Sequence, residues 1–314
     1  MESIKVFSPG SITNLSCGYD ILGVCLESRG DEIKVTKTSN KGITIKSITG
    51  FDLTRDINEN VSGIAAQALL SKINIDHGFE IEINKGIKPG SGIGSSAASS
   101  AGTVFAINQL LDSPFSLLDL VKFSMEGEKF VSGAYHADNV APIIFGGITL
   151  VRTIDDIDII SLPTPKDLEV VIVRPNIEIK TADSRKVVKK KIKIEKMTQQ
   201  SANLGSFISS LYTEDYDLMS RSVIDQIVEP DRAVLIPEFE KVKIISKESG
   251  SIAAGISGSG PSIFSLSNDR VISNNILDKI SDHYNSMDIE FDGFISKVNS
   301  GGIKTIEVKW NMLA

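Results

Sequence analysis

The sequence has 314 residues, 41% of them hydrophobic and 23% charged, which is the composition of a globular protein long enough for two domains. Forty acidic against 33 basic residues give a net charge of −7, and this excess of negative charge argues against general binding to nucleic acid or anionic membranes. No apolar run is long enough for a membrane span and the first residues lack a secretory signal, so we expect a cytoplasmic protein with small-molecule partners.

Two predicted strands, residues 4–6 and 33–36, begin the chain and enclose an unusual segment. Residues 8–23 contain Ser, Pro and Gly, yet they also carry four apolar side chains, Ile12, Leu15, Ile21 and Leu22. A surface turn does not explain those apolar residues, so we predict a partly buried loop whose polar side chains turn inward. Within it, the Asn14 amide can donate and accept hydrogen bonds, and the Asp20 carboxylate can hold a cation. The alternative is that both residues only cap local turns.

The next elements lead into the most informative stretch of the chain. Residues 61–72 carry apolar side chains at three- to four-residue intervals, which predicts a helix. Residues 78–84 alternate apolar and polar side chains, which predicts a half-buried strand. Helical spacing returns over residues 95–111. The segment KPGSGIGSSAASSAG, residues 88–102, therefore connects a strand to a helix.

This glycine-rich segment has the properties of an anion site. Gly90, Gly92 and Gly94 tolerate positive φ and let a ligand approach the backbone. Ser95 and Ser96 follow at the predicted helix start, where free N–H groups and the helix dipole favour a phosphate. The Ser96 hydroxyl could also face a phosphate-bound Mg²⁺. The segment is neither a Walker A loop nor a dinucleotide fingerprint, and a serine-capped turn is the structural alternative.

Two segments after the glycine-rich loop carry further candidate residues. The predicted helix at residues 117–131 contains Glu126 and Glu128, and one of them could hold Mg²⁺ if it points at the loop; otherwise both are solvated. The segment SGAYHADNVAPIIF then brings His136, which we expect to be a hydrogen-bonded structural residue, and Asn139, which would suit a substrate hydroxyl. A strand is predicted at residues 147–151.

The second half of the chain reads as a separate α+β unit. Residues 155–166 are acidic and contain two prolines, so we divide the chain into domains of residues 1–160 and 161–314. A second glycine-serine stretch, residues 255–262, lies between two predicted strands, and a cleft with one such loop from each domain would suit a nucleotide and a second substrate. We predict the other strands of this unit at residues 168–175, 293–298 and 303–309, and its helices at 181–193, 198–212, 216–228, 237–249 and 272–284.

Three motifs in this order resemble those of the GHMP kinases. They are SPGSITNLSCGYDILG near the N-terminus, PGSGIGSSAA in the glycine-rich loop and GISGSGPSIFSL in the second half. The first motif and SGAYHADNVAPIIFGG are most similar to the homoserine kinases of this superfamily. The resemblance covers nearly the whole chain. It implies a two-domain α+β fold, with a ribosomal-protein-S5-like N-terminal domain and a ferredoxin-like C-terminal domain that hold ATP and Mg²⁺ between them.

The resemblance also implies roles for individual residues. The ATP phosphates would contact Pro89, Gly90, Ser91, Gly92, Ile93, Gly94, Ser95, Ser96, Gly258 and Ser259. Mg²⁺ would lie near Ser96 and Glu128. The amino-acid substrate would face Asn14, Asp20, Asn139, Arg185 and Arg232, with Asn139, Thr181 and Arg185 closest to phosphoryl transfer. Two departures from the family pattern, Gly10-Ser11-Ile12-Thr13 and Ser16-Cys17-Gly18-Tyr19-Asp20, leave Asn14 and Asp20 in place.

The implied reaction is the ATP-dependent phosphorylation of the side-chain hydroxyl of L-homoserine, in threonine biosynthesis. The residue types agree with it, because two arginines suit a carboxylate, Asn139 suits a hydroxyl and Asp20 suits an ammonium group that mevalonate lacks. No residue stands out as a general base, so we expect positioning and charge neutralisation to carry the reaction. The alternatives are a kinase or decarboxylase for a mevalonate-type alcohol, and a nucleotide-binding sensor without turnover. The sequence does not fix the oligomeric state, and a homodimer is one possibility.

Overall fold

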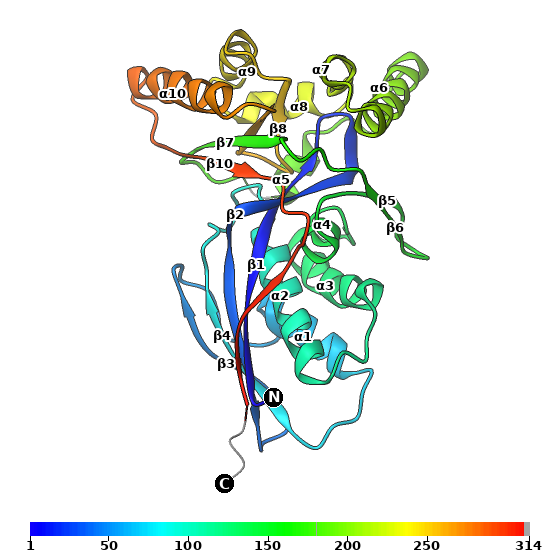
Figure 1. The fold of residues 1–314 in the computed structure, drawn as a ribbon, viewed down its shortest axis with the longest axis vertical. Helices are drawn as coiled ribbons and strands as arrows, with labels where there is room; N and C mark the ends of the chain where they lie inside the picture. The colour runs from blue at the N-terminus through cyan, green and yellow to red at the C-terminus, as the bar shows by residue number, and fades with distance from the viewer. Residues whose placement is uncertain (180, 311–314) are drawn as a thin grey trace.

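Two β-sheets, each with helices on one side, make up the molecule (Figure 1). The computed structural model describes residues 1–179 and 181–310, with the side chains of 181 and 182 left aside. In this described part, no helix is long and apolar enough to cross a membrane.

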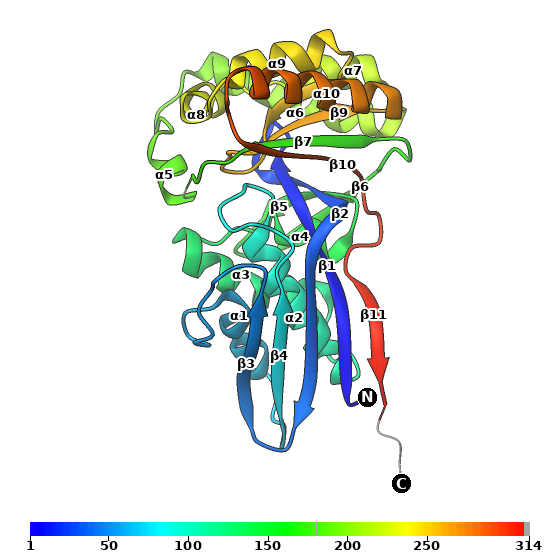
Figure 2. The same cartoon turned by 90° about the vertical axis from the view of Figure 1, so that its left-hand side faces the viewer.

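The first sheet has seven strands and carries the N-terminal half of the chain. Its main path runs β11-β1-β2-β4-β3, and β5 pairs with β2 and with β6. The strands are β1 (Ser3–Asn14), β2 (Gly18–Thr38), β3 (Gly42–Thr49), β4 (Gly78–Asn84), β5 (Ile148–Thr153), β6 (Asp158–Leu162) and β11 (Lys304–Lys309). Helices on one side of this sheet are α1 (Val61–Leu70), α2 (Ser95–Leu110), α3 (Leu117–Ser132) and α4 (Val140–Phe145), as Figure 2 shows.

The second sheet has four antiparallel strands in the order β10-β7-β9-β8. They are β7 (Glu169–Pro175), β8 (Ala253–Ile256), β9 (Ile263–Ser267) and β10 (Phe291–Lys297). The accompanying helices are α5 (Thr181–Lys186), α6 (Ile194–Thr213), α7 (Tyr216–Ser222), α8 (Glu229–Arg232), a 3₁₀ turn (Ala233–Leu235), α9 (Phe239–Glu248) and α10 (Arg270–Ser286). Helices α9 and α10 lie over this sheet at the top of Figure 1.

Most predicted elements are present, and four differ. Residues 8–23 are not a loop: β1 and β2 run on as a long hairpin, and its tight turn places Asn14, Leu15 and Ser16 at positive φ. The helix predicted at residues 181–193 ends at Lys186, and the one at 216–228 ends at Ser222. The last strand does not complete the second unit, because β11 pairs with β1 of the first sheet.

Local sequence explains where the helices near the cavity begin and end. The α3 helix starts with a capping box, in which Ser116 and Asp119 bond each other's backbone N–H groups, and stops at Gly133 with φ of 78°. The α2 helix starts differently. Its N-cap is Gly94 at φ of 70°, and no side chain caps its first N–H groups. These donors therefore stay available at the helix start.

A buried ion pair fixes the glycine-rich loop to the first sheet. Lys85 donates from Nζ to Asp31 Oδ2 at 2.5 Å and to the Ser95 carbonyl at 2.8 Å, and both charged side chains are almost fully buried. Asp31 Oδ1 accepts from the backbone N–H groups of Gly86 and Ile87. Burial lowers the Lys85 pKa, and the Asp31 charge opposes that shift. The pair thus ties β2, the loop entrance and the first turn of α2 together.

Replacing Lys85 should destabilise the protein strongly. Lys85→Ala leaves Asp31 as a buried charge without its cation, and we expect the free energy of unfolding in urea to fall by about 3–5 kcal/mol. Lys46→Ala is the matched control, since Lys46 makes a solvent-exposed ion pair with Glu80 in the same sheet and its loss should change little. Equal, small effects of the two variants would show that the buried pair does not stabilise the loop.

Candidate active site

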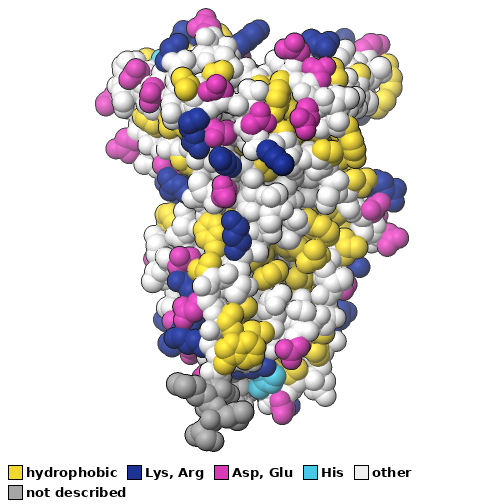
Figure 3. All heavy atoms as spheres, viewed as in Figure 1, with side chains coloured by type: hydrophobic (Ala, Val, Ile, Leu, Met, Phe, Trp, Pro, Cys, Tyr) yellow, Lys and Arg dark blue, Asp and Glu magenta, His cyan; other side chains and the backbone are white. Residues whose placement is uncertain are grey.

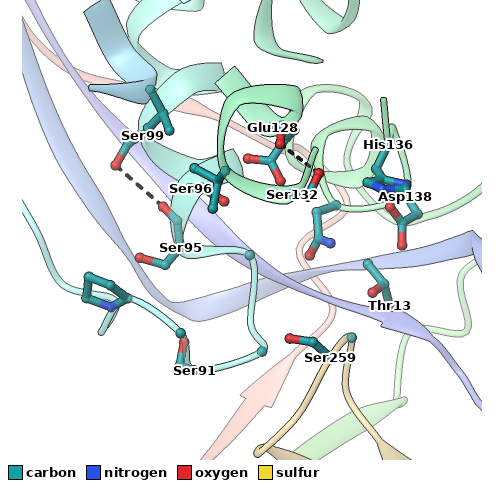
Figure 4. A pocket seen from close by; sticks show the side chains of 18 of the residues that line it. Thr13, Ser91, Ser95, Ser96, Ser99, Glu128, Ser132, His136, Asp138 and Ser259 are labelled. Carbon is teal, nitrogen blue, oxygen red and sulfur yellow. Dashed lines mark hydrogen bonds between the residues drawn. The ribbon is translucent and has the colours of Figure 1, made fainter. Parts of the chain in front are cut away.

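A cavity of about 440 Å³ lies between the two sheets and receives residues from both. The glycine-rich loop contributes Pro89 to Gly92 and Gly94 to Ser96, and the loop after β8 contributes Gly258 and Ser259. Figure 4 shows Ser95, Ser96 and Glu128 on one side of this space and Ser259 on the other. The two glycine-serine motifs, which are distant in sequence, therefore meet at one site.

The two loops hold each other through hydroxyl groups and glycines. Ser257 Oγ donates to the Gly92 carbonyl at 2.6 Å, and Ser262 Oγ donates to the Ser91 carbonyl at 2.6 Å. Gly92 has φ of +79°, and a Cβ there would lie 2.7 Å from the carbonyl oxygens of both Ser257 and Gly260. Only glycine permits this backbone approach.

The uncapped start of α2 and a buried carboxylate form the polar end of the cavity. Ser96 lies in the first turn of α2, and Glu128 reaches the same place from α3 (Figure 4). Burial raises the pKa of Glu128 to about 7, against the effect of a hydrogen bond from Ser96. Glu128 Oε1 is buried and has no hydrogen-bond partner among the described residues. A hydroxyl and an orphaned carboxylate oxygen beside free N–H groups fit a cation that accompanies a phosphate.

The described residues contain no cluster of three or more His, Cys, Asp or Glu side chains that could hold a metal ion by themselves. A site of one hydroxyl and one carboxylate is instead typical of Mg²⁺ that keeps its waters and binds chiefly to nucleotide phosphates.

At the other end of the cavity, charged side chains from both units converge. Arg185 donates from Nη2 to Asp20 Oδ1 at 2.8 Å, and both side chains are 29% exposed. Asp20 has φ of +60°, and its backbone N–H donates to Asn14 Oδ1 at 3.0 Å. Burial lowers the Arg185 pKa, but the charge and hydrogen bond of Asp20, together with Tyr19 and Asp138, outweigh burial, so that the Arg185 pKa is raised. The hairpin turn thus presents an anion to a cation from α5.

Arg232 is the second cation of this cluster, and it is held firmly. It is 3% exposed and donates to the carbonyls of Ser184 and Gly258, at 3.2 and 2.9 Å. Its guanidinium lies 5.0 Å from the ring centroid of Tyr19 and donates to the Tyr19 hydroxyl. Asn14 Nδ2 also donates to the Gly258 carbonyl, at 2.8 Å. Two of the predicted substrate residues, Asn14 and Arg232, therefore contact the second glycine-serine loop.

Asn139 lies between the two ends of the cavity. Its Oδ1 accepts a hydrogen bond from Ser11 Oγ at 2.9 Å, which leaves the amide nitrogen free to donate. The neighbouring Asp138 is 4% exposed, and burial, followed by the nearby Asp20 charge, raises its pKa to about 7. Asp138 was not singled out from the sequence, because a buried acid and a solvated one look alike there.

His136 is hydrogen-bonded, as expected, and it also lines the cavity. Its Nδ1 lies 3.3 Å from Arg185 Nη2, and since a guanidinium can only donate, Nδ1 must accept. The proton of the neutral ring then sits on Nε2, which is buried and has no partner within the part of the chain that the structure describes. Burial and the Arg185 charge lower the His136 pKa, in agreement with a neutral ring. The ring therefore offers an unused N–H donor where it lines the cavity.

Two predicted residues stand apart from this set. The Ile93 side chain is 5% exposed and packs in the core, so it does not line the cavity, and its carbonyl accepts from the Ser11 N–H at 3.2 Å. The Thr181 side chain lies outside the described residues. Conversely, sequence patterns gave no signal for one wall of the cavity, which consists of Leu53, Thr54, Glu59, Asn60, Val61, Val131 and Ser132.

Comparison with known proteins agrees with this architecture. The family described as GHMP kinases N terminal domain matches residues 60–147, and the one described as GHMP kinases C terminal matches residues 207–286. The homoserine kinase of Chlorobium phaeobacteroides (strain BS1) is 36% identical over 98% of this chain and 100% of its own length. That of Methanococcus maripaludis (strain C5) is 42% identical over 85% of this chain and 88% of its own.

Solved structures show the same relationship. The crystal structure of a homoserine kinase from Cytophaga hutchinsonii superposes with a TM-score of 0.94 at 41% identity, covering 98% of both chains. A mevalonate kinase from L. major, solved with R-mevalonate, has a TM-score of 0.70 at 14% identity over 94% of this chain and 96% of its own, and so shares the fold. The chain therefore belongs to the GHMP kinase family and, within it, to the homoserine kinases.

Proposed function

We propose that this protein transfers the γ-phosphoryl group of ATP to the side-chain hydroxyl of L-homoserine and so forms O-phospho-L-homoserine, a step of threonine biosynthesis. The observation that carries the substrate is the cluster of Asp20, Arg185 and Arg232, which shares one cavity with the glycine-rich loop. Its relatives named homoserine kinase support the same substrate. Because ATP and a small amino acid are its substrates, we place the reaction in the cytoplasm.

The glycine-rich loop is the proposed phosphate site. Its glycines bring the backbone close to the ligand, and the uncapped N-terminus of α2 supplies N–H groups and a positive dipole end. We propose that Ser96 and Glu128 hold the Mg²⁺ that accompanies ATP, since Glu128 Oε1 is buried without a partner. When bound, Mg²⁺ would neutralise charge on the phosphates that the chain's own donors leave uncompensated.

The opposite end of the cavity is the proposed amino-acid site. Arg185 and Arg232 would bind the carboxylate, with the free Nε2–H of His136 as a further donor. Asp20 would bind the ammonium group. In the structure Asp20 and Arg185 neutralise each other, and the zwitterionic substrate could satisfy both when it inserts between them. The free amide nitrogen of Asn139 would then donate to the hydroxyl that accepts the phosphoryl group.

These residues support a mechanism by positioning. The transition state of phosphoryl transfer is loose, so the hydroxyl needs little prior deprotonation. Holding the hydroxyl and the phosphate in one cavity supplies orientation, and the donors of α2 stabilise developing charge. Neither Asn139 nor Arg185 is a base. We therefore propose that no general base acts.

The substrate is tested by measuring ADP release with ATP and Mg²⁺ against L-homoserine, mevalonate, L-serine and L-threonine. We expect ADP release only with L-homoserine. Mevalonate lacks the ammonium group, and L-serine and L-threonine carry the hydroxyl one carbon closer to the amino-acid end than L-homoserine does. Release with mevalonate would overturn the role of Asp20. Binding of ATP with no release from any acceptor would favour a sensor over a kinase.

Asp20→Asn should selectively weaken homoserine use. Asparagine keeps the size and tolerates the left-handed backbone at this position, but it loses the charge that contacts the ammonium group. We expect kcat/KM for homoserine to fall about thirtyfold, equivalent to about 2 kcal/mol, with an unchanged KM for ATP. Asp158→Asn, which removes an exposed carboxylate of β6 outside the cavity, is the control. Unaltered homoserine kinetics in Asp20→Asn would refute the proposed pose.

Asp138 allows the absence of a general base to be tested, because it is the buried acid beside Asn139 with a pKa of about 7. If Asp138 accepted the hydroxyl proton, kcat would rise with pH through about 7 and Asp138→Asn would lose about 10²–10⁴-fold. We expect the pH profile of kcat to show no ionisation near 7 that disappears in Asp138→Asn, and a loss of less than about tenfold in that variant. The KM for ATP serves as the check that the variant remains folded.

A further inference from the structure

A second and much smaller cavity, of about 20 Å³, lies where the glycine-rich loop meets the second sheet. The loop contributes Lys88 and Ser91 to its lining, the second sheet contributes Arg174 and Asp292, and β2 contributes Arg29. Among the described residues, only Ser91 lines both this small cavity and the large one. A space of this size holds about one water molecule or one halide ion, and neither a nucleotide nor an amino acid fits it.

Positive charge exceeds negative charge around the small cavity. Arg29, Lys88 and Arg174 supply three cations, and Asp292 supplies one carboxylate, so the described lining carries a net charge of +2. Arg29 donates from Nη2 to Asp292 Oδ1 at 3.3 Å, which occupies that carboxylate. In Figure 3, Lys and Arg side chains gather over β7 and β10 in the upper middle of the view, with acidic side chains among them. The cavity therefore has more cations than the chain compensates.

Arg174 is the cation that lacks a partner. It lies directly opposite Asp292 in the pairing of β7 with β10, but Asp292 bonds to Arg29 instead. Within the described part of the chain, the Arg174 guanidinium makes no hydrogen bond and no ion pair within 4 Å. Burial lowers the Arg174 pKa, as does the Arg29 charge, while the Asp292 charge raises it. A partly buried guanidinium without a counter-ion is a group that an anion would stabilise.

The Ser91 hydroxyl is the second unsatisfied group of the small cavity. Ser91 is 2% exposed, and its Oγ has no hydrogen-bond partner among the residues that the structure describes. The Ser91 carbonyl, in contrast, accepts from Ser262 Oγ, so the backbone of the residue is fixed. A buried hydroxyl without a partner is costly, because it has lost the hydrogen bonds that it makes in water. Its O–H can donate to an anion.

The other two cations are held at the small cavity by contacts that leave donors free. The Arg29 guanidinium carbon lies 4.7 Å from the centroid of the Phe294 ring, and such a contact covers a face of the guanidinium and not the N–H groups at its edge. Lys88 Nζ donates to Asn176 Oδ1 at 2.6 Å, which uses one of its three donors. Asn176 in turn donates to Glu290, whose carboxylate does not line the cavity. The cavity is therefore prepared for negative charge.

We propose that the small cavity binds a single small monovalent anion such as chloride. The anion would accept hydrogen bonds from the Arg174 guanidinium and the Ser91 hydroxyl, and it would lower the net charge of the lining from +2 to +1. A water molecule could also accept from Ser91, but it would leave the excess positive charge uncompensated. Because Ser91 lines both cavities, the ion would lie directly behind the proposed phosphate loop.

Bromide is the probe for this site in a crystal, because it resembles chloride and scatters anomalously. Crystals of the unaltered protein grown in potassium bromide should show an anomalous peak in the small cavity, within hydrogen-bond distance of the Arg174 guanidinium and of Ser91 Oγ. Electron density at this place without an anomalous signal would be water, and that result would overturn the proposal.

Chloride should also stabilise the protein in solution. The melting temperature is measured in mixtures of potassium chloride and potassium gluconate at constant ionic strength, so that the cation and the screening stay the same. Gluconate is too large for a cavity of about 20 Å³. We expect the Tm to rise with chloride and to follow the logarithmic dependence of a single site. A rise that is linear in chloride would indicate an adventitious ion only and would count against the site.

Arg174→Gln tests whether the response comes from this cavity. The variant removes one charge and keeps an amide donor, so the Kd for chloride should rise at least about tenfold. In gluconate alone it should melt no lower than the unaltered protein, because Arg174 has no counter-ion there. The control Arg152→Gln removes the cation of an exposed ion pair on β5 and should respond to chloride as the unaltered protein does. Equal responses of the two variants would refute the assignment. Neither experiment uses ATP or homoserine, so a failure of the proposed reaction would leave the result unaffected.

Discussion

The buried pair of Lys85 and Asp31 is the constraint on which the site depends. A charge pair inside a protein is costly to desolvate, and it stabilises only where further hydrogen bonds satisfy both groups. Here the carboxylate accepts from two backbone N–H groups at the loop entrance, and the ammonium group donates to the first turn of α2. The glycine-rich loop is thereby fixed at both ends, although its three glycines would otherwise make it flexible. The proposed phosphate site can then be present before its ligand arrives.

The site also contains two arginines but only one of them pairs with a carboxylate in the described structure. Asp20 and Arg185 satisfy each other across the two units, whereas Arg232 and Tyr19 are held by backbone carbonyls and ring contacts. Such an arrangement suits a zwitterion, which brings one charge of each sign. A dicarboxylate or a plain alcohol would leave one member of the cluster without a partner. We therefore propose that the charges of this cluster separate amino-acid substrates from mevalonate-type ones on a shared fold.

Periodicity and glycine placement predicted much of this fold. The helices at residues 61–72, 95–111 and 117–131 and the strand at 78–84 are present, although α2 is buried on nearly all sides and not on one face alone. The hairpin from Ser3 to Thr38 was missed, since its turn depends on positive φ at Asn14, Leu15 and Ser16, residues that do not usually signal it. The pairing of β11 with β1 was also missed, because no local pattern reveals which sheet a distant strand will join.

The site was predictable only as far as its residues lie in motifs. Asp20 was singled out from its own segment, and the resemblance added roles for Arg185 and Arg232. The structure brings the three residues together, but their roles stay predictions. The free N–H of His136 could not be predicted from the sequence, because it follows from the Arg185 guanidinium that lies beside the ring in the structure. Asp138 likewise differs from a solvated acid only through burial.

Ser257 and Ser262, from the second half of the chain, donate hydrogen bonds to the glycine-rich loop of the first half. The proposed phosphate site therefore needs both halves. A gene fragment that stopped after β6 would encode every glycine of the loop, yet it would lack both hydroxyls that hold the loop's carbonyls, as well as the strand that completes the first sheet. Recombination between distant relatives therefore cannot exchange one half without matching the other.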